Sequence, residues 1–210
     1  MDAISTILWD VGGVLLTNAW DRTERDAVLA RFGLDPGEFE RRHEDVFERF
    51  ERDEISLDEY LRRTVFFEPR RFAQSDFVEA MRAQSRVLAG GALAILRQLA
   101  ASHEYTLAAV NNESRALNEF RLTNFGLADE LDAFFSSCYL GVRKPDRRIY
   151  QIALDVLGRD PERVVFIDDR AENVAAAAGL GIHAIRYQGS TQLSDELARL
   201  GVRITQNVLD

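Results

Sequence analysis

The chain has 210 residues and a formal net charge of −9, and 46% of its residues are hydrophobic. This length suffices for one sizeable core together with a small accessory lobe. Since 35 acidic residues outnumber 26 basic ones, neither nucleic acid nor an anionic membrane surface is an expected partner.

The sequence also argues against membrane, secreted and zinc proteins. An apolar run such as residues 174–182 is well short of the roughly 20 residues that span a bilayer. The first ten residues, MDAISTILWD, carry no cationic segment and do not resemble a secretory signal. Cys138 is the single cysteine and the three histidines are widely spaced, which disfavours a disulfide or a zinc site. We therefore expect a cytoplasmic protein.

The first elements along the chain are a strand and then a helical segment. Residues 3–9 are apolar and β-prone and end in Asp10-Val11-Gly12-Gly13, which predicts a buried strand followed by a turn. Residues 21–86 carry Phe and Leu at helical spacing between charged residues, which predicts about four helices. We interpret three aromatic residues in this segment or directly before it as core of the helical lobe, with contact to the cleft as the alternative: Trp20, Phe47 and Phe50.

After Gly90-Gly91 the sequence alternates between helices and strands. Its pattern predicts helices over 92–101, 114–125, 147–157 and 171–180, and strands over 105–110, 133–137, 164–167 and 182–187. Such alternation indicates an α/β fold with a Rossmann-like parallel sheet and helices on both of its faces. We predict a catalytic core formed by residues 1–16 and 89–210, and an inserted all-helical cap formed by residues 17–88.

Polar residues follow the predicted strands at the point where each strand ends. In an open α/β sheet, ligands bind outside the carboxyl ends of the strands, so these residues should meet at one edge. Three carboxylates in one place repel each other unless a cation lies among them, and Mg²⁺ prefers oxygen ligands of this kind. The sequence therefore predicts a divalent metal among the carboxylates of Asp10, Asp168 and Asp169. Lys144, Asn111 and Asn112 are expected at the same edge.

Lys144 is the only lysine of the chain, in which all other basic residues are arginine. A planar guanidinium cannot replace a compact ammonium at a site that needs a point charge. We expect Lys144 to neutralise an incoming phosphate and to keep Asp10 ionised. Arg115, early in the helix that follows Asn111 and Asn112, is a candidate substrate-binding residue.

Three segments resemble the motifs of one known family. They are WDVGGVL around Asp10, GVRKPDRRIY around Lys144, and VVFIDDRAENV around Asp168 and Asp169. In this order, and with a polar residue after the second strand, they resemble the haloacid dehalogenase superfamily. The helical insertion looks like the cap of that family. The chain is most similar to helical-cap phosphatases of the α-D-glucose-1-phosphatase and epoxide-hydrolase N-terminal type.

The resemblance implies Mg²⁺-dependent hydrolysis of a small phosphate monoester, such as a sugar phosphate, through an aspartyl-phosphate intermediate. It makes Asp10 both the nucleophile and a metal ligand. Lys144 would stabilise the charge on the transferring phosphoryl group and position Asp10. The backbone carbonyl of Gly12 and the side chains of Asp168 and Asp169 are the other implied metal ligands.

The resemblance also implies a phosphate-binding set. Asn111 stands where the family usually has Ser or Thr, and its side-chain amide can donate a hydrogen bond to phosphate. The backbone N–H groups of Gly12 and Asn112 complete the implied phosphate cradle.

Two positions depart from the family pattern, and Asn111 in place of Ser or Thr is the milder departure. Phosphatases of this family usually carry a second aspartate two residues after the nucleophile, as general acid and base, but here the residue is Gly12. General acid–base catalysis contributes roughly 10²–10⁴-fold, so its loss predicts a slower enzyme or a substitute group. Two alternatives therefore stay open: a metal-independent 2-haloacid dehalogenase, and a catalytically weakened protein that binds or senses a phosphate ligand.

Overall fold

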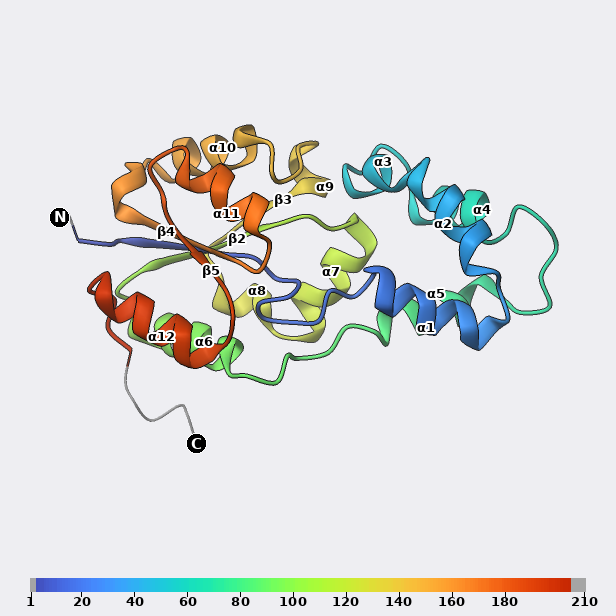
Figure 1. Cartoon of the computed structure of the whole chain (residues 1–210), viewed down its shortest axis with the longest axis horizontal. Helices are drawn as coiled ribbons and strands as arrows, with labels where there is room; N and C mark the ends of the chain where they lie inside the picture. The colour runs from blue at the N-terminus through green and yellow to red at the C-terminus, as the bar shows by residue number, and fades with distance from the viewer. Residues whose placement is uncertain (1–2, 205–210) are drawn as a thin grey trace.

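The computed structural model describes residues 3–204, and its centre is a five-stranded sheet (Figure 1). The strands lie in the order β3-β2-β1-β4-β5, and all four neighbouring pairs are parallel. The predicted α/β fold with a parallel sheet is therefore confirmed. Their bounds are β1 Thr6–Trp9, β2 Thr106–Asn111, β3 Ala133–Ser136, β4 Val164–Asp168 and β5 His183–Arg186.

Helices cover both faces of the sheet. In Figure 1, α10 and α11 lie above the sheet, while α6 and α12 lie below it. Helix α12 is absent from the sequence prediction, although Leu193 and Leu197 stand four residues apart within it and are fully buried. The bounds are α6 Ala92–Ser102, α7 Arg115–Asn124, α8 Leu127–Glu130, α9 Ser137–Leu140, α10 Arg147–Leu157, η1 Pro161–Arg163, α11 Ala171–Ala178 and α12 Ser190–Arg199.

Strand β1 shows why the sheet is buried on both sides. Successive side chains of a strand point to opposite faces. Ile7 and Trp9 accordingly pack in the core that includes α6 and α12, while Leu8 packs in the core that includes α10. All four residues of β1 are buried, and β1 is the central strand of the sheet. Asp10, which follows it, is therefore held firmly at the carboxyl end of this central strand.

The predicted cap segment, residues 17–88, forms a helical body beside the sheet (Figure 1). Within the described residues it has five helices, one more than the pattern predicts, because Asp45 and Val46 separate the short α3 from α2. Tyr60, Leu61 and Phe77 are fully buried at its centre. The bounds are α1 Arg22–Phe32, α2 Pro36–Glu44, α3 Phe47–Glu51, α4 Leu57–Thr64 and α5 Gln74–Arg82.

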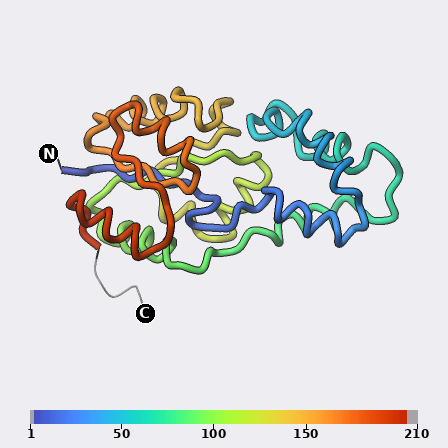
Figure 2. Tube along the Cα trace, in the orientation of Figure 1, coloured from blue at the N-terminus to red at the C-terminus, as the bar shows by residue number. Residues whose placement is uncertain are grey.

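Two chain segments connect this body to the sheet, and Figure 2 traces them in blue and green. They pair with each other in antiparallel fashion: the N–H of Thr17 donates to the carbonyl of Arg86 at 2.8 Å, and that of Leu88 to the carbonyl of Leu15 at 3.2 Å. The predicted boundaries between core and cap fall within this pair of segments, and the division stays a prediction. Residues 1–2 and 205–210 of the predicted core lie outside the described residues.

No helix within residues 3–204 is both long enough and apolar enough to cross a bilayer.

Candidate active site

Three carboxylates meet at the carboxyl ends of the two central strands. Asp10 follows β1, Asp168 ends β4 and Asp169 comes next, and these strands are neighbours in the sheet. One oxygen from each side chain lies within 4.8 Å of the others. The topology therefore brings together the acidic residues that the sequence places after separate strands.

Lys144 lies between two of these carboxylates. Its Nζ is 2.9 Å from Asp10 Oδ1 and 2.6 Å from Asp168 Oδ2, and the residue is only 3% exposed. Burial works against the charge of this ammonium, but the two carboxylates outweigh it and raise the pKa of Lys144. Lys144 therefore stays protonated, and it holds the carboxylate of Asp10 in one orientation.

The protein supplies too little positive charge for this cluster. Burial raises the pKa of Asp10 to about 7, against the attraction of Lys144 and with the added repulsion of Asp168. Burial and the charge of Asp168 also raise the pKa of Asp169. Several buried acidic groups around a single ammonium raise one another's pKa values, and a further cation among them would lower these pKa values again.

The carboxylates differ in how fully the protein occupies them. Asp168 accepts hydrogen bonds from Arg170 N at 2.8 Å and from Asn173 Nδ2 at 3.0 Å, in addition to Lys144. Asp169 Oδ1, in contrast, is buried, and no group within residues 3–204 forms a hydrogen bond to it. A buried acceptor without a partner is costly unless a ligand completes it. Asp169 thus has a buried oxygen that a metal ion could complete, whereas both oxygens of Asp168 already have partners in the protein.

Gly13 makes the close approach of Asp169 feasible. It adopts a φ of +75°, and a Cβ at this position would collide with the Asp169 carboxylate. Only glycine combines this backbone conformation with the absence of a side chain. The space that the Asp169 carboxylate needs therefore explains why residue 13 is a glycine.

The two oxygens of Asp10 are in different situations. Oδ1 accepts hydrogen bonds from the backbone N–H of Val11 at 2.7 Å and from Lys144. Within the described residues no group hydrogen-bonds to Oδ2, and Asp10 borders the cavity described below. One oxygen is thus fixed and the other is available for reaction.

The missing carboxylate at Gly12 has no direct replacement at the same point. A Cβ on Gly12 would lie 3.1 Å from Asn18 Oδ1 and 3.8 Å from Arg121 Nη1. Arg121 itself donates to Glu113 Oε2 at 2.8 Å and to the carbonyl of Thr17 at 2.7 Å. Burial raises the pKa of Glu113 despite this ion pair. The space in which the family carries an acid is therefore bordered by an amide and a guanidinium.

The structure separates the two asparagines that the sequence places together. Asn112 borders the cavity, and its side chain clasps the backbone of Lys144: Nδ2 donates to the carbonyl at 2.9 Å and Oδ1 accepts from the N–H at 2.8 Å. Asn111, as the last residue of β2, points to the other face. There its amide donates to Asn118 Oδ1 at 2.9 Å and accepts from Ser136 Oγ at 2.7 Å. Both ends of the Asn111 amide therefore have partners in the protein, and its contact with phosphate stays a prediction.

Arg115 is also placed differently from the expectation. It does not belong to the cavity wall, and its Nε lies 2.6 Å from Asp53 Oδ2 in the loop after α3. Its Nη2 donates to the carbonyl of Cys138 at 3.2 Å. The first turn of α7 faces the cap, so the carboxylate of Asp53 in the cap holds the Arg115 guanidinium away from Asp10, Asp168 and Asp169. Arg115 joins the cap to the core in this structure, and its contact with a substrate stays a prediction.

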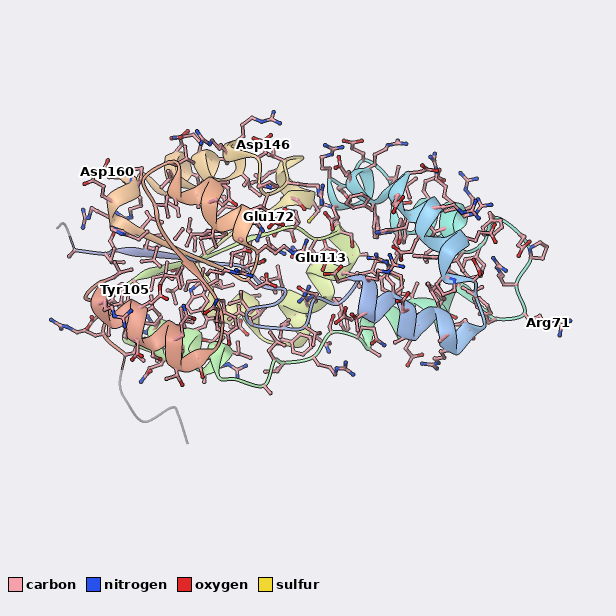
Figure 3. The ribbon with its side chains drawn as sticks, in the orientation of Figure 1. Arg71, Tyr105, Glu113, Asp146, Asp160 and Glu172 are labelled. Atoms are coloured by element: carbon pink, nitrogen blue, oxygen red, sulfur yellow. The ribbon has the colours of Figure 1, made fainter. Side chains whose placement is uncertain are left out.

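A cavity of about 410 Å³ lies between the sheet edge and the cap. Figure 3 labels Glu113 and Glu172 on the side of the core that faces the cap. Trp20, Phe47 and Phe50 border this cavity, and Trp20 and Phe50 also belong to the hydrophobic core of the cap. The cavity residues of the core include Asp10, Gly12, Asn112, Glu113, Arg121, Arg143 and Lys144, and those of the cap include Trp20, Arg25, Glu40, His43, Phe47, Phe50 and Glu51.

Some cavity residues carry no sequence signal. Arg25 and Glu40 form a buried ion pair at 2.7 Å between α1 and α2, and Arg143 lies 2.5 Å from Glu51 of α3. Each pair joins residues that are distant along the chain and carry no motif. The position of Arg143 directly before Lys144 was the one available indication, since neighbours of a site residue often border the same cavity.

Comparison with known proteins identifies the family. The family model of haloacid dehalogenase-like hydrolases matches residues 4–181. The chain belongs to this family. The resemblance stated from the motifs is therefore confirmed, and the protein is a haloacid dehalogenase-like hydrolase, an enzyme.

Individual relatives cover different shares of this hydrolase. Flavin mononucleotide hydrolase 1 of Arabidopsis thaliana, a chloroplast protein, is 30% identical over 197 residues, which are 91% of this chain and 79% of that protein. (S)-2-haloacid dehalogenase 4A of Burkholderia cepacia is 33% identical over 82 residues, 39% of this chain and 36% of that enzyme. Both similarities lie within one family, but they point to different reactions.

Among solved structures, a haloacid dehalogenase family enzyme of Bacteroides thetaiotaomicron in a magnesium complex matches with a TM-score of 0.76 and 20% identity. The match covers 90% of this hydrolase and 96% of that chain. The same enzyme with magnesium and inorganic phosphate gives a TM-score of 0.73. At this identity the similarity establishes the fold.

Proposed function

We propose that this hydrolase is a metal-dependent phosphomonoesterase that acts through an aspartyl phosphate on Asp10. The observation that carries the proposal is the arrangement of Lys144 between Asp10 and Asp168 beside the unpartnered oxygen of Asp169. A reaction at phosphorus brings an anionic group to this edge, and both an ammonium and a metal ion stabilise it there.

The residues present fit Mg²⁺. Carboxylate oxygens of Asp10 and Asp169, with the backbone carbonyl of Gly12, would hold the ion, and Asp168 would contribute directly or through water. Bound Mg²⁺ would neutralise the phosphate oxygens and so permit an anionic nucleophile to approach. The magnesium and phosphate complexes of the Bacteroides thetaiotaomicron enzyme support this proposal.

The chain's own residues define the steps. Asp10 Oδ2 attacks phosphorus, the bond from phosphorus to the ester oxygen breaks, and the leaving alcohol takes a proton from water, since Gly12 has no carboxyl group to supply one. Lys144 holds Asp10 Oδ1 and balances the charge of the phosphoryl group in transfer. Water then attacks the phosphorus of the aspartyl phosphate, which releases inorganic phosphate and restores Asp10.

Dehalogenation is the second candidate, supported by the partial similarity to 2-haloacid dehalogenase 4A. That reaction needs a carboxylate nucleophile and the carboxylate of the substrate at the same place. The oxygen of Asp169 that no described group partners would repel such a substrate unless a cation were present. This argument favours the phosphatase.

The cavity favours a small ester whose alcohol carries an apolar or flat portion. Aromatic side chains of the cap border the cavity opposite Asp10. Flavin mononucleotide, which the Arabidopsis thaliana relative hydrolyses by its name, is a phosphate ester of this kind. We therefore place it beside sugar phosphates in the substrate class to be tested.

The test is a phosphate-release screen over flavin mononucleotide, sugar phosphates, nucleotides and an aryl phosphate, with Mg²⁺ and with a chelator. We expect release that requires Mg²⁺ and that the Asp10→Asn variant loses, because an amide cannot attack phosphorus. Full activity in chelator, or in Asp10→Asn, would refute the proposal. Chloride release from 2-chloropropionate in chelator would establish the dehalogenase, and phosphate binding without turnover would establish a binding protein.

A further inference from the structure

His43 of α2 occupies a special place in the cap. The residue is 8% exposed and borders the cavity opposite the carboxylates. Its ring stacks against Phe47 at 5.2 Å between centroids and against Phe39 at 5.9 Å. These aromatic contacts hold the plane of the imidazole, so its two nitrogens face fixed directions.

One of these nitrogens belongs to a chain of hydrogen bonds inside the cap. Trp20 Nε1 lies 2.8 Å from the Tyr60 hydroxyl, which lies 2.8 Å from His43 Nδ1. The indole N–H can only donate, so the hydroxyl oxygen of Tyr60 accepts from it. Tyr60 is fully buried, and its own proton needs an acceptor. His43 Nδ1 is the acceptor in contact, which makes it the unprotonated nitrogen of the ring.

The charge of the ring follows from its surroundings. Burial and, to a smaller extent, the nearby Arg25 guanidinium lower the pKa of His43 to about 4, against the opposing carboxylates of Glu40 and Asp21. The imidazole is therefore neutral near pH 7. A neutral imidazole with an unprotonated Nδ1 carries its proton on Nε2.

The proton on Nε2 has no acceptor within the described residues. No group within residues 3–204 accepts a hydrogen bond from Nε2. This nitrogen is also not one of the described polar atoms that are both buried from solvent and without a partner. Since His43 borders the cavity, its free N–H is accessible from there. The cap thus offers one neutral donor of fixed direction beside the aromatic face of Phe47.

We propose that His43 Nε2–H is a substrate-recognition group that donates a hydrogen bond to a neutral acceptor on the alcohol portion of the phosphate ester. The proposal rests on the phosphatase function proposed above. The acceptor is a carbonyl oxygen, a ring nitrogen or a hydroxyl on a ring that packs beside Phe47. A neutral N–H selects such an atom by geometry, whereas the charged groups at the sheet edge select phosphate.

The tautomer can be measured without activity. In ¹⁵N-histidine-labelled protein at pH 7, long-range ¹H–¹⁵N correlation spectra should show a protonated Nε2 and an unprotonated Nδ1 for the ring that the variants assign to His43. His183, whose Nε2 lies 3.0 Å from the carbonyl oxygen of Glu162, is expected to give a second ring of the same tautomer. His43→Gln should remove the first of these rings from the spectrum, while His103→Gln, at an exposed position, should leave it in place. In Tyr60→Phe, which lacks the proton that fixes Nδ1, the two tautomers should both appear. A protonated Nδ1 on the ring assigned to His43 in the wild type would overturn the proposal.

Kinetics then test recognition. The substrates are flavin mononucleotide, glucose 1-phosphate and 4-methylumbelliferyl phosphate, which carry ring acceptors, and 2-naphthyl phosphate, which carries none on its ring. For the best of the first three, His43→Leu should lower kcat/KM by about 3- to 10-fold, the effect of one hydrogen bond. His43→Gln, which keeps a donor, should recover part of it.

The control is 2-naphthyl phosphate, for which kcat/KM should change less than about 2-fold in folded His43→Leu. Equal losses on all four substrates, or no loss on any, would overturn the role of His43 even if phosphate release is robust. If the wild type releases no phosphate from any ester with Mg²⁺, the proposed function fails instead, and the tautomer measurement still decides the state of His43.

Discussion

Lys144 illustrates how a single residue type can be required by geometry. Its Nζ reaches two carboxylates that approach from different strands, and the side chain is almost completely buried. A guanidinium is planar and larger, so it cannot occupy the same point between Asp10 and Asp168. This position between Asp10 and Asp168 argues against the interpretation that the only lysine of an arginine-rich chain occurs at residue 144 by chance.

We expect Lys144→Arg to lower kcat/KM by about 10²-fold or more, the usual cost of losing one preorganised donor. The control is Arg203→Lys, which makes the reverse exchange at an exposed position. The measurement is steady-state phosphate release on protein shown to be folded by circular dichroism. Activity of Lys144→Arg near that of the wild type would show that charge alone is sufficient.

Gly12 is the residue at which this chain departs most from its family. Its φ is not positive, unlike that of Gly13, so an aspartate there is limited by space rather than by backbone strain. The close neighbour is Asn18 Oδ1. We expect the double variant Gly12→Asp/Asn18→Ala to increase turnover of alkyl phosphates relative to aryl phosphates, by up to about 10²–10⁴-fold. An unchanged ratio in folded protein would mean that a group such as Glu113 already transfers the proton.

His43 predicts a pH dependence of stability. Its pKa is lowered from 6.5 to about 4 in the fold, so the unfolded chain binds a proton below pH 6.5 that the folded protein does not. This contribution to the free energy of unfolding is present above pH 6.5 and is lost as the pH falls toward 4. The loss is about 3 kcal/mol at most, at about 1.4 kcal/mol per pH unit.

Urea unfolding of the wild type and of His43→Gln at pH 7, 6, 5 and 4.5 measures this contribution. The difference between the two proteins should shift steadily in favour of the variant as the pH falls. Parallel curves would contradict a neutral, buried His43.

At the scale of elements, ion pairs from α7 and from the loop before α10 join the core to the loop and helix around α3. Arg115 pairs with Asp53, and Arg143 pairs with Glu51. Because the Arg115 side chain is 44% exposed, its pair is of the kind that contributes at most about 1 kcal/mol.

We therefore expect Arg115→Ala to change kcat/KM by less than about 3-fold and the free energy of unfolding by less than about 1 kcal/mol. Steady-state kinetics and urea unfolding check both values. A rise in KM of more than about 10-fold would restore Arg115 to the substrate-binding set that the sequence suggested.

The elements also show which patterns the sequence can reveal. The strands were predictable because continuous apolar runs end in turn residues and polar residues. Helix α12 was not predicted, since the ten residues of STQLSDELAR show only two large apolar side chains to a pattern search. The direction of a side chain at a strand end was equally hidden. Asn111 and Asn112 are adjacent, yet only Asn112 faces the cavity.

At the scale of the whole molecule, the core part of the site follows from the fold and the cap part does not. Parallel strands in a known order bring Asp10, Lys144 and Asp168 together, so motifs and topology suffice to predict their meeting. The Trp20–Tyr60–His43 chain depends on how three cap segments pack, and no motif records that packing. The residues that meet at the sheet edge can therefore be predicted from the sequence, while the arrangement of the cap residues around the cavity requires the structure.

The most direct test of the account is to look for a phosphoryl group on Asp10. Wild-type enzyme with Mg²⁺ and an aryl phosphate is quenched in acid during turnover, and its intact mass and peptides are measured by mass spectrometry. Because Gly12 provides no base for the second step, we expect an adduct of one phosphoryl group on the peptide that contains Asp10, absent in Asp10→Asn. Phosphate release with no adduct in the wild type, or with the adduct on Asp169, would contradict the central claim.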